Sequence, residues 1–268
     1  MANVEWARLK ASDLNGLAAA GALVLLPVAS TEQHGPHLPT GVDTFLCGEI
    51  CRRAAEKLVA AKLPAVVAPT LWAGLAEHHV AFGGSFTLSV STYHALLRDL
   101  CGSILRAGFS RVVVVNGHGG NVSALNALSS ELTRELQAPV AVATYWLLAE
   151  EAFAEILEDQ RSVLHACEAE TSMMMAAEPD LVDAGRLPEA MGPTFERTGQ
   201  ALSQPLHRWR SFKEISETGV LGDARRATAE KGERLLEAAA EALAGRLAKG
   251  EPWARPGRAG PRIKSGRP

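Results

Sequence analysis

The chain has 268 residues, of which 47% are hydrophobic, so it is long and apolar enough to bury a sizeable core. Its formal net charge is −3, with 21% of residues charged, and this balance indicates neither a nucleic-acid partner nor a membrane surface. The longest apolar runs are far shorter than the ~18 residues that span a bilayer. The N-terminus also lacks the basic and apolar segments of a secretory signal, so we expect a cytoplasmic protein.

Apolar, strand-like runs alternate with amphipathic, helix-like segments along most of the chain. In chain order, we predict a strand at 22–30, a helix at 43–63, a strand at 64–70, a loop at 71–87, a helix at 91–107, a strand at 111–116, a helix at 119–136, a strand at 139–145, helices at 149–160 and 165–177, an irregular stretch at 186–222 and a helix at 224–248. Strands that alternate with helices of this length favour a three-layer α/β/α fold with a mainly parallel central sheet.

No internal repeat or linker divides the chain before its end, so we predict one α/β domain over residues 1–250. Residues 251–268 form a basic tail rich in Pro and Gly, which we expect to be disordered. The four cysteines have neither the spacing of a zinc ribbon nor that of a C-x-x-C redox pair, and we expect them to be small buried residues: Cys47, Cys51, Cys101 and Cys167.

The segment after the first predicted strand carries residue types that bind metals. In parallel sheets, ligands bind beyond the carboxyl ends of the strands. Glu32 and His34 lie two residues apart, so on an extended segment their side chains share one side. Asp43 follows at the start of the predicted helix, where an N-cap is the alternative role. Two carboxylates and an imidazole suit a divalent metal, and His37 fits a supporting position beside them better than a ligand position.

The segment N-G-H-G-G-N follows the predicted strand at 111–116. Glycines on both sides of His118 let the backbone pass close to a ligand, and the histidine has no apolar face to pack on, so we predict a metal ligand there. Val122 stands where a dinucleotide-binding fingerprint would have its third glycine, which excludes that motif. We expect three neighbours of the histidine to bind substrate or support the ligands: Gly119, Gly120 and Asn121.

The third predicted strand end leads to H-A-C-E-A-E-T-S. On a helix over residues 165–177, His165 and Glu168 are three residues apart and share a face, with Glu170 on the flank. The apolar residues that follow indicate a buried helix, whose carboxylates need partners such as a metal. Either Glu168 or Glu170 would complete the ligand set. His165 is not needed as a ligand and is our candidate for the catalytic general acid or base.

Together the three strand ends offer enough ligands for two metal ions about 3.5–4 Å apart. The ligands that we predict from the residues are Glu32, His34, Asp43, His118 and one of Glu168 or Glu170. Asp43 is our candidate for a bridging ligand. Paired ions lower the pKa of a shared water molecule, which then attacks a carbonyl group.

These segments resemble the motifs of the creatininase family of metal-dependent amidohydrolases. The similar motifs are E-Q-H-G-P-H-L-P with an Asp after it, N-G-H-G-G-N, and H-A-x-x-x-E-T-S. The resemblance implies a creatininase-like α/β fold with a binuclear site for Zn²⁺ or Mn²⁺, with Fe²⁺ as an alternative, and a homo-oligomer, often a hexamer. It also implies that His165 is the catalytic histidine and that four residues are metal ligands: Glu32, His34, Asp43 and His118.

Two positions depart from the family pattern. Creatininase itself has a ligand Glu where Gly120 stands here, and the family often has Thr where Val42 stands. The first departure argues against creatinine as the substrate. It implies that Glu170, which matches the Glu of the family's E-T-S motif, supplies the missing carboxylate, with Glu168 as the alternative.

The leading hypothesis is hydrolysis of a C–N bond in a small cyclic amide or formamide by a metal-activated water. The family also contains deformylases, a peptidase and hydrolases of cyclic sugar derivatives, so a lactonase or peptidase on the same metals is the alternative enzyme. A non-catalytic metal-binding protein is the alternative of another class. Trp146 and Trp72 are candidates for the walls of the substrate pocket, although isolated aromatic residues more often serve in packing. We expect the loop with His78 and His79 to help shape the pocket.

Overall fold

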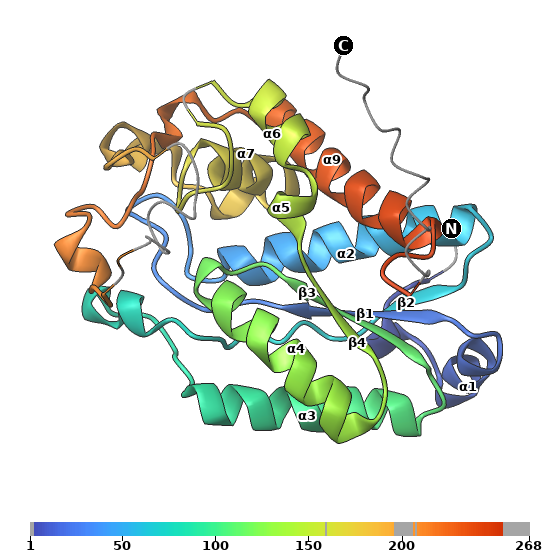
Figure 1. Cartoon of the computed structure of the whole chain (residues 1–268). Coiled ribbons are helices and arrows are strands. Elements are labelled where there is room, and N and C mark those ends of the chain that lie inside the picture. The colour runs from blue at the N-terminus through green and yellow to red at the C-terminus, as the bar shows by residue number, and fades with distance from the viewer. Residues whose placement is uncertain (1–2, 159, 196–205, 207, 254–268) are drawn as a thin grey trace, which may run out of the picture.

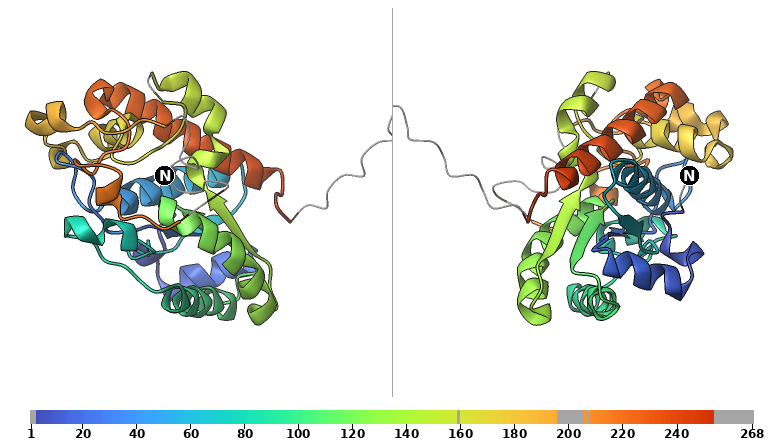
Figure 2. Two further views of the ribbon diagram at one scale, coloured as in Figure 1. Left: turned by 60° about the vertical axis from the view of Figure 1, so that its left-hand side comes forward. Right: turned by 90° about the vertical axis from the view of Figure 1, so that its right-hand side faces the viewer.

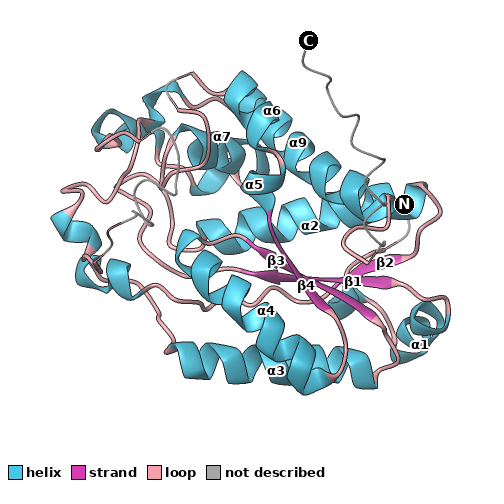
Figure 3. Ribbon diagram, viewed as in Figure 1, coloured by secondary structure: helices cyan, strands magenta, loops and turns pink. Residues whose placement is uncertain are grey.

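A four-stranded parallel sheet forms the centre of the molecule. The computed structural model describes residues 3–158, 160–195, 206 and 208–253. The sheet has the strand order β2-β1-β3-β4, and Figure 3 shows it between helices. Its strands are β1 (Leu23–Val28), β2 (Ala65–Val67), β3 (Arg111–Asn116) and β4 (Val140–Thr144).

Helices cover both faces of this sheet, which makes three layers (Figures 1 and 2). On one face lie α3 (Val90–Arg106) and α4 (Val122–Leu136), and on the other lie α2 (Val42–Ala60) and α9 (Ala229–Ala248). Helix α7 (Glu168–Ala177) packs against both α2 and α9. The other α-helices within the described residues are α1 (Ala11–Ala19), α5 (Tyr145–Leu148) and α6 (Glu150–Ile156).

Strand β1 shows why the sheet needs helices on both faces. All six of its residues are buried. Val24 and Leu26 belong to an apolar cluster that includes Leu97 of α3, whereas Leu23 and Leu25 belong to a separate cluster on the side of α2. This alternation follows from the two-residue period of a strand, and a run that is apolar on both faces is typical of a parallel sheet covered on both sides.

The register of the strands brings three chain segments to one edge of the sheet. Val28 at the end of β1 pairs with Asn116 at the end of β3, and Asn116 pairs with Thr144 at the end of β4. The residues that follow these three ends therefore meet in space. This is the edge at which parallel α/β sheets bind ligands.

The structure confirms the predicted strands and long helices, with differences at their ends. Helix α1 was not predicted, the strand at 64–70 is limited to β2, and the loop at 71–87 contains the 3₁₀ turn Glu77–Phe82. The prediction that residues 165–177 form one helix was wrong, because Ala166 has a left-handed φ of 49° and α7 begins at Glu168. His165 and Glu168 therefore do not share a helix face.

Two further predictions concern the cysteines and the end of the chain. All four cysteines are buried and free, as predicted. Residues 254–268, which make up most of the predicted tail, lie outside the described residues. Among the helices that the structure describes, none is long and apolar enough to cross a membrane.

Candidate metal centre

Five predicted ligands converge at the carboxyl edge of the sheet, and all are buried. Glu32 and His34 lie on the loop that follows β1, and Asp43 is the second residue of α2. His118 follows β3, and Glu170 lies in the first turn of α7. Their side chains form two groups of three, in each of which the ligand atoms lie within 4.8 Å of one another. Glu32 and His34 form a third such group with His165.

The first group consists of Glu32, Asp43 and His118. Nδ1 of His118 lies 3.2 Å from Oε2 of Glu32 and 3.1 Å from Oδ2 of Asp43. Donor atoms bound at about 2.1 Å to a tetrahedral metal lie roughly 3.4 Å from one another. These contacts therefore have the spacing of ligands around one ion.

The second group consists of His34, Asp43 and Glu170. Nε2 of His34 lies 3.2 Å from Oδ1 of Asp43, so the two oxygens of this carboxylate face different groups. Oε2 of Glu170 accepts a hydrogen bond of 2.5 Å from the backbone N–H of Ala166. The left-handed conformation of Ala166 thus helps to hold the carboxylate at the start of α7.

Backbone carbonyls orient both ligand imidazoles. Nδ1 of His34 donates to the carbonyl oxygen of Glu32 at 3.1 Å, and Nε2 of His118 donates to that of Leu75 at 3.2 Å. In each ring the other nitrogen then faces the carboxylates. Metal-binding histidines show this arrangement, because the outer hydrogen bond fixes the tautomer that presents a lone pair to the ion.

Several ligand atoms are close to one another without being aligned for hydrogen bonds. Within the described part of the chain, both carboxylate oxygens of Glu32, Nε2 of His34 and Oδ2 of Asp43 are buried and have no hydrogen-bond partner. Leaving buried polar atoms unsatisfied is costly, and a cation among them would satisfy all of them at once. The donor set of two imidazoles and three carboxylates therefore fits borderline divalent ions such as Zn²⁺.

The metal-free cluster has strongly perturbed pKa values. Burial raises the pKa of Glu170 to about 7. Burial by itself lowers the pKa of His34, but the carboxylates of Asp43, Glu170 and Glu32 outweigh it and raise the value to about 9. Burial also raises the pKa of Glu32, and the charge of Asp43 adds to this effect. Without a metal the cluster therefore holds protons in the place of cations.

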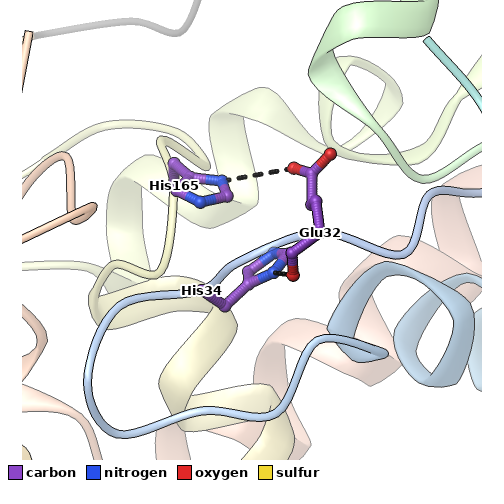
Figure 4. Close-up of side chains that lie close together, drawn as sticks. All are labelled: Glu32, His34 and His165. Carbon is purple, nitrogen blue, oxygen red and sulfur yellow. Dashed lines mark hydrogen bonds and ion pairs between the residues drawn. The ribbon is translucent and has the colours of Figure 1, made fainter. Parts of the chain in front are cut away.

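His165 and His79 face the same oxygen of Glu32. Nδ1 of His165 lies 3.7 Å from Oε1 of Glu32, and Figure 4 shows this ring opposite the loop that carries Glu32 and His34. Nε2 of His79 lies 3.1 Å from the same oxygen. Burial lowers the pKa of both histidines well below the ordinary value, so both rings are neutral near pH 7.

Sequence reasoning placed His79 in a loop that shapes the pocket and did not name it as a site residue. Its position depends on the 3₁₀ turn Glu77–Phe82, which has no simple periodic signal. The pair His78 and His79, in a loop rich in Gly and Phe, was the sequence feature that indicated a role near the site. Phe212, from the stretch predicted to be irregular, also packs against these histidines. Its ring centroid lies 4.2 Å from that of His79 and 4.8 Å from that of His165.

A small hollow lies beside the ligands. Its volume is about 20 Å³, which is space for about one water molecule. Three of the residues predicted to contact substrate line it, namely Gly119, Gly120 and Trp146. Trp72 is half exposed and does not line this hollow.

The other predicted supporting residues lie further out. Nε2 of His37 contacts the hydroxyl of Thr171 at 2.7 Å. The Asn121 side chain accepts from the N–H of Leu75 at 3.0 Å and so holds the segment whose carbonyl orients His118. Glu168 turns away from the ligands.

The contacts of Glu168 bear on which carboxylate completes the ligand groups. Its carboxylate pairs with Lys231 of α9 at 2.7 Å, and it belongs to none of the three groups of candidate ligands. Of the two carboxylates that the sequence left open, the geometry favours Glu170.

Close packing accounts for the glycine at position 120. A Cβ atom there would lie 2.4 Å from the carbonyl oxygen of Leu75, 2.5 Å from Nε2 of His118 and 2.7 Å from the His78 ring. No side chain fits at this position without displacing the orienting hydrogen bond of His118. A carboxylate must therefore come from elsewhere in the chain.

Comparison with known proteins agrees with this site. Residues 7–247 match the family model described as Creatininase: Creatinine amidohydrolase. The chain belongs to the creatininase family. One relative, the mycofactocin precursor peptide peptidase of Mycolicibacterium smegmatis, is 34% identical over 233 residues, which cover 86% of each chain. Another, the creatinine amidohydrolase of Pseudomonas putida, is 29% identical over 244 residues, which cover 85% of this creatininase-family chain and 89% of that protein.

Solved structures show the same fold. The crystal structure of creatinine amidohydrolase (creatininase) has a TM-score of 0.80 at 26% identity and covers 94% of this chain and 99% of that one. A creatininase variant described as of Zn-Zn type has a TM-score of 0.78 at 26% identity, over 94% of this chain and 100% of the other. This likeness confirms the predicted creatininase-like α/β fold.

Proposed function

We propose that this creatininase-family protein is a metal-dependent amidohydrolase that cleaves the C–N bond of a small cyclic amide or formamide. The observation that carries the proposal is the pair of buried ligand groups that share Asp43, one carboxylate oxygen facing each group. A binuclear centre built in this way is suited to hydrolysis of a carbonyl compound.

We assign Glu32, Asp43 and His118 to one ion, and His34, Asp43 and Glu170 to the other. The existence of Zn-Zn and Mn forms of creatininase supports Zn²⁺ or Mn²⁺ as the ions. When bound, such ions supply a water molecule of lowered pKa and polarise the substrate carbonyl.

His165 is the residue that we assign to proton transfer. It lines the hollow, with Nδ1 3.7 Å from Oε1 of Glu32. Burial lowers its pKa, so the ring is neutral near pH 7 and has one nitrogen lone pair. The ring then takes a proton from the attacking water and returns it to the leaving nitrogen. Because His165 belongs to neither proposed ligand set, it is free to move protons between these two positions.

A peptidase on the same site is the second candidate function. The 34% identity to a protein named as a mycofactocin precursor peptide peptidase favours it. A peptide presents the same amide group to the ligands as a small amide does, so the roles of Asp43 and His165 would not change. The two candidate functions differ in the substrate: a peptidase must also accommodate the peptide chain on either side of the scissile bond.

Metal analysis followed by a substrate screen tests the proposal. We expect about two zinc or manganese ions per chain after loading, and hydrolysis that a chelator abolishes and added metal restores. The screen compares cyclic amides, N-formyl compounds, short peptides and lactones. Turnover of peptides alone would favour the second candidate. Fewer than about one ion per chain, with no activity after loading, would reject a metal-dependent enzyme.

Cytoplasmic location and assembly into a homo-oligomer, with a hexamer as the family's common form, stay predictions. Size-exclusion chromatography with light scattering measures the assembly directly.

A further inference from the structure

The side chain of Gln33 lies between the two histidines that face Glu32. Its Nε2 is 3.0 Å from Nδ1 of His79, 3.0 Å from Nε2 of His165 and 3.0 Å from the carbonyl oxygen of Gly219. Gln33 is itself buried, at 8% exposure. A buried amide with so many polar contacts restricts which nitrogen of each neighbouring ring carries a proton.

The orientation of the amide follows from its other end. Oε1 of Gln33 accepts a hydrogen bond of 2.8 Å from the backbone N–H of Gly35, so this atom is the oxygen and the opposite atom is the NH₂ group. The NH₂ group has two hydrogens to donate and three neighbouring atoms within hydrogen-bond distance.

His165 does not accept a hydrogen bond from the Gln33 amide. Its Nε2 lies 2.8 Å from the main-chain carbonyl oxygen of Gln33, and a carbonyl oxygen only accepts, so this nitrogen carries the proton. Nδ1 of His165 is therefore a lone pair, on the side of the ring that faces Glu32. That is the nitrogen from which a general base must act.

The two hydrogens of the amide then go to His79 and to Gly219. Nδ1 of His79 accepts one of them, so the proton of this ring is on Nε2, which lies 3.1 Å from Oε1 of Glu32. His79 thus presents an N–H to the same oxygen toward which His165 presents a lone pair.

We propose that Gln33 is a positioning residue that fixes the tautomers of both histidines, His165 through its main-chain carbonyl and His79 through its side-chain amide. The Nε2–H of His79 then faces the Glu32 carboxylate, 3.1 Å from Oε1. The role of His165 as a base rests on the proposed function, whereas the two tautomers do not.

The segment from Phe212 to Leu221, whose two end residues line the hollow, contacts the same amide through Gly219. Gly219 receives the second hydrogen and has a φ of +80°, and a Cβ atom there would lie 2.1 Å from Oε1 of Gln33. The chain between Phe212 and Leu221, both of which line the hollow, is therefore held against Gln33. The Gln33 side chain therefore contacts both histidines and the segment from Phe212 to Leu221.

Long-range ¹H–¹⁵N spectra of histidine-labelled protein test the proposal, because they distinguish protonated from unprotonated ring nitrogens. The spectra are recorded on metal-free and zinc-loaded protein, and the eight histidines are assigned by substitution. We expect the Nε2–H form for both His79 and His165. An Nδ1–H form of either ring in the wild-type protein overturns the proposal, whether or not zinc binds.

The variant Gln33→Glu separates the two routes. It replaces the donating NH₂ group with an accepting oxygen of the same shape, so Nδ1 of His79 gains a proton, whereas His165 keeps its Nε2–H because the main-chain carbonyl is unchanged. Gln160→Glu is the matched control, since Gln160 is also buried and its amide donates to the carbonyl oxygen of Ser162, which does not line the hollow.

Two results with these variants contradict the proposal. One is an unprotonated Nδ1 of His79 in Gln33→Glu, and the other is the same change of tautomer in the Gln160→Glu control. Zinc content is measured on every sample. A protein that takes up no zinc but shows both tautomers refutes the metal centre and leaves the assignment of Gln33 standing.

Discussion

Nε2 of His34 lies 3.2 Å from Oδ1 of Asp43, where the loop after β1 meets the first turn of α2. The second oxygen of the same carboxylate lies 3.1 Å from Nδ1 of His118. Burial opposes ionisation of Asp43, but the two imidazoles outweigh it and hold the pKa of the carboxyl below its usual range. Asp43 is therefore an anion that both ligand groups share.

This sharing predicts different metal losses for two substitutions. Asp43→Ala removes a ligand from both groups and should abolish binding of both ions, whereas Glu170→Gln should lose only the ion held with His34. Metal content per chain after loading and desalting measures the difference. Asp99→Ala, at an exposed position of α3, is the control and should bind as the wild type does. Equal losses in the two site variants would contradict a bridging Asp43.

Metal affinity should rise with pH. The pKa of His34 in the metal-free protein is raised to about 9, so the ring is protonated near pH 7, and a metal must displace that proton. We expect the affinity for zinc to rise by about tenfold or more per pH unit between about pH 6.5 and about pH 8.5. Competition with a chelator at several pH values measures this slope. An affinity that is constant or falls with pH would show that His34 is not a ligand.

His165→Ala should retain its metal but lose turnover. The ring contributes no atom to the proposed ligand sets, and removal of a general acid or base lowers kcat by about 100-fold or more. Parallel metal analysis and rate measurement on the best substrate from the screen provide the check. Undiminished hydrolysis would show that another group transfers the proton.

The contact between Lys231 and Glu168 predicts a loss of stability. Glu168 is fully buried, and its carboxylate lies 2.7 Å from Nζ of Lys231. Lys231→Met takes the cation away from a buried carboxylate, so the free energy of unfolding should fall by about 3 kcal/mol. The double variant with Glu168→Gln should lose less than Lys231→Met alone. Urea unfolding measures both, and a single-variant loss of less than about 1 kcal/mol would count against a buried ion pair.

Two glycines in left-handed conformations form a matched pair for a packing test. Gly219 and Gly21 have φ values of +80° and +68°, so alanine pays a similar backbone cost of about 1 kcal/mol at each. Only at Gly219 does the new Cβ meet another atom, Oε1 of Gln33 at 2.1 Å. Gly219→Ala should therefore destabilise the protein more than Gly21→Ala. Equal midpoints of urea unfolding for the two variants would show that the loop around Gly219 relaxes to accommodate the new Cβ atom.

Strong local patterns made the fold predictable. The apolar run that contains β1 and the run of valines in β3 allow no solvent-exposed face, so a parallel sheet covered by helices follows from them. The break before α7 was missed because a single left-handed residue, Ala166, ends what looks like a continuous helical pattern. Short elements such as β2 depend on pairing with their neighbours, and their ends cannot be located from the sequence.

The residue types at the predicted strand ends were sufficient to predict that Glu32, His34, Asp43 and His118 lie close together. Parallel strands must bring their carboxyl ends to one edge, so this outcome depends on topology alone. The folded chain places Glu170 rather than Glu168 beside His34 and Asp43, and it brings His79 next to Glu32. Those choices depend on the direction of side chains on a helix and a loop, which packing against distant segments sets.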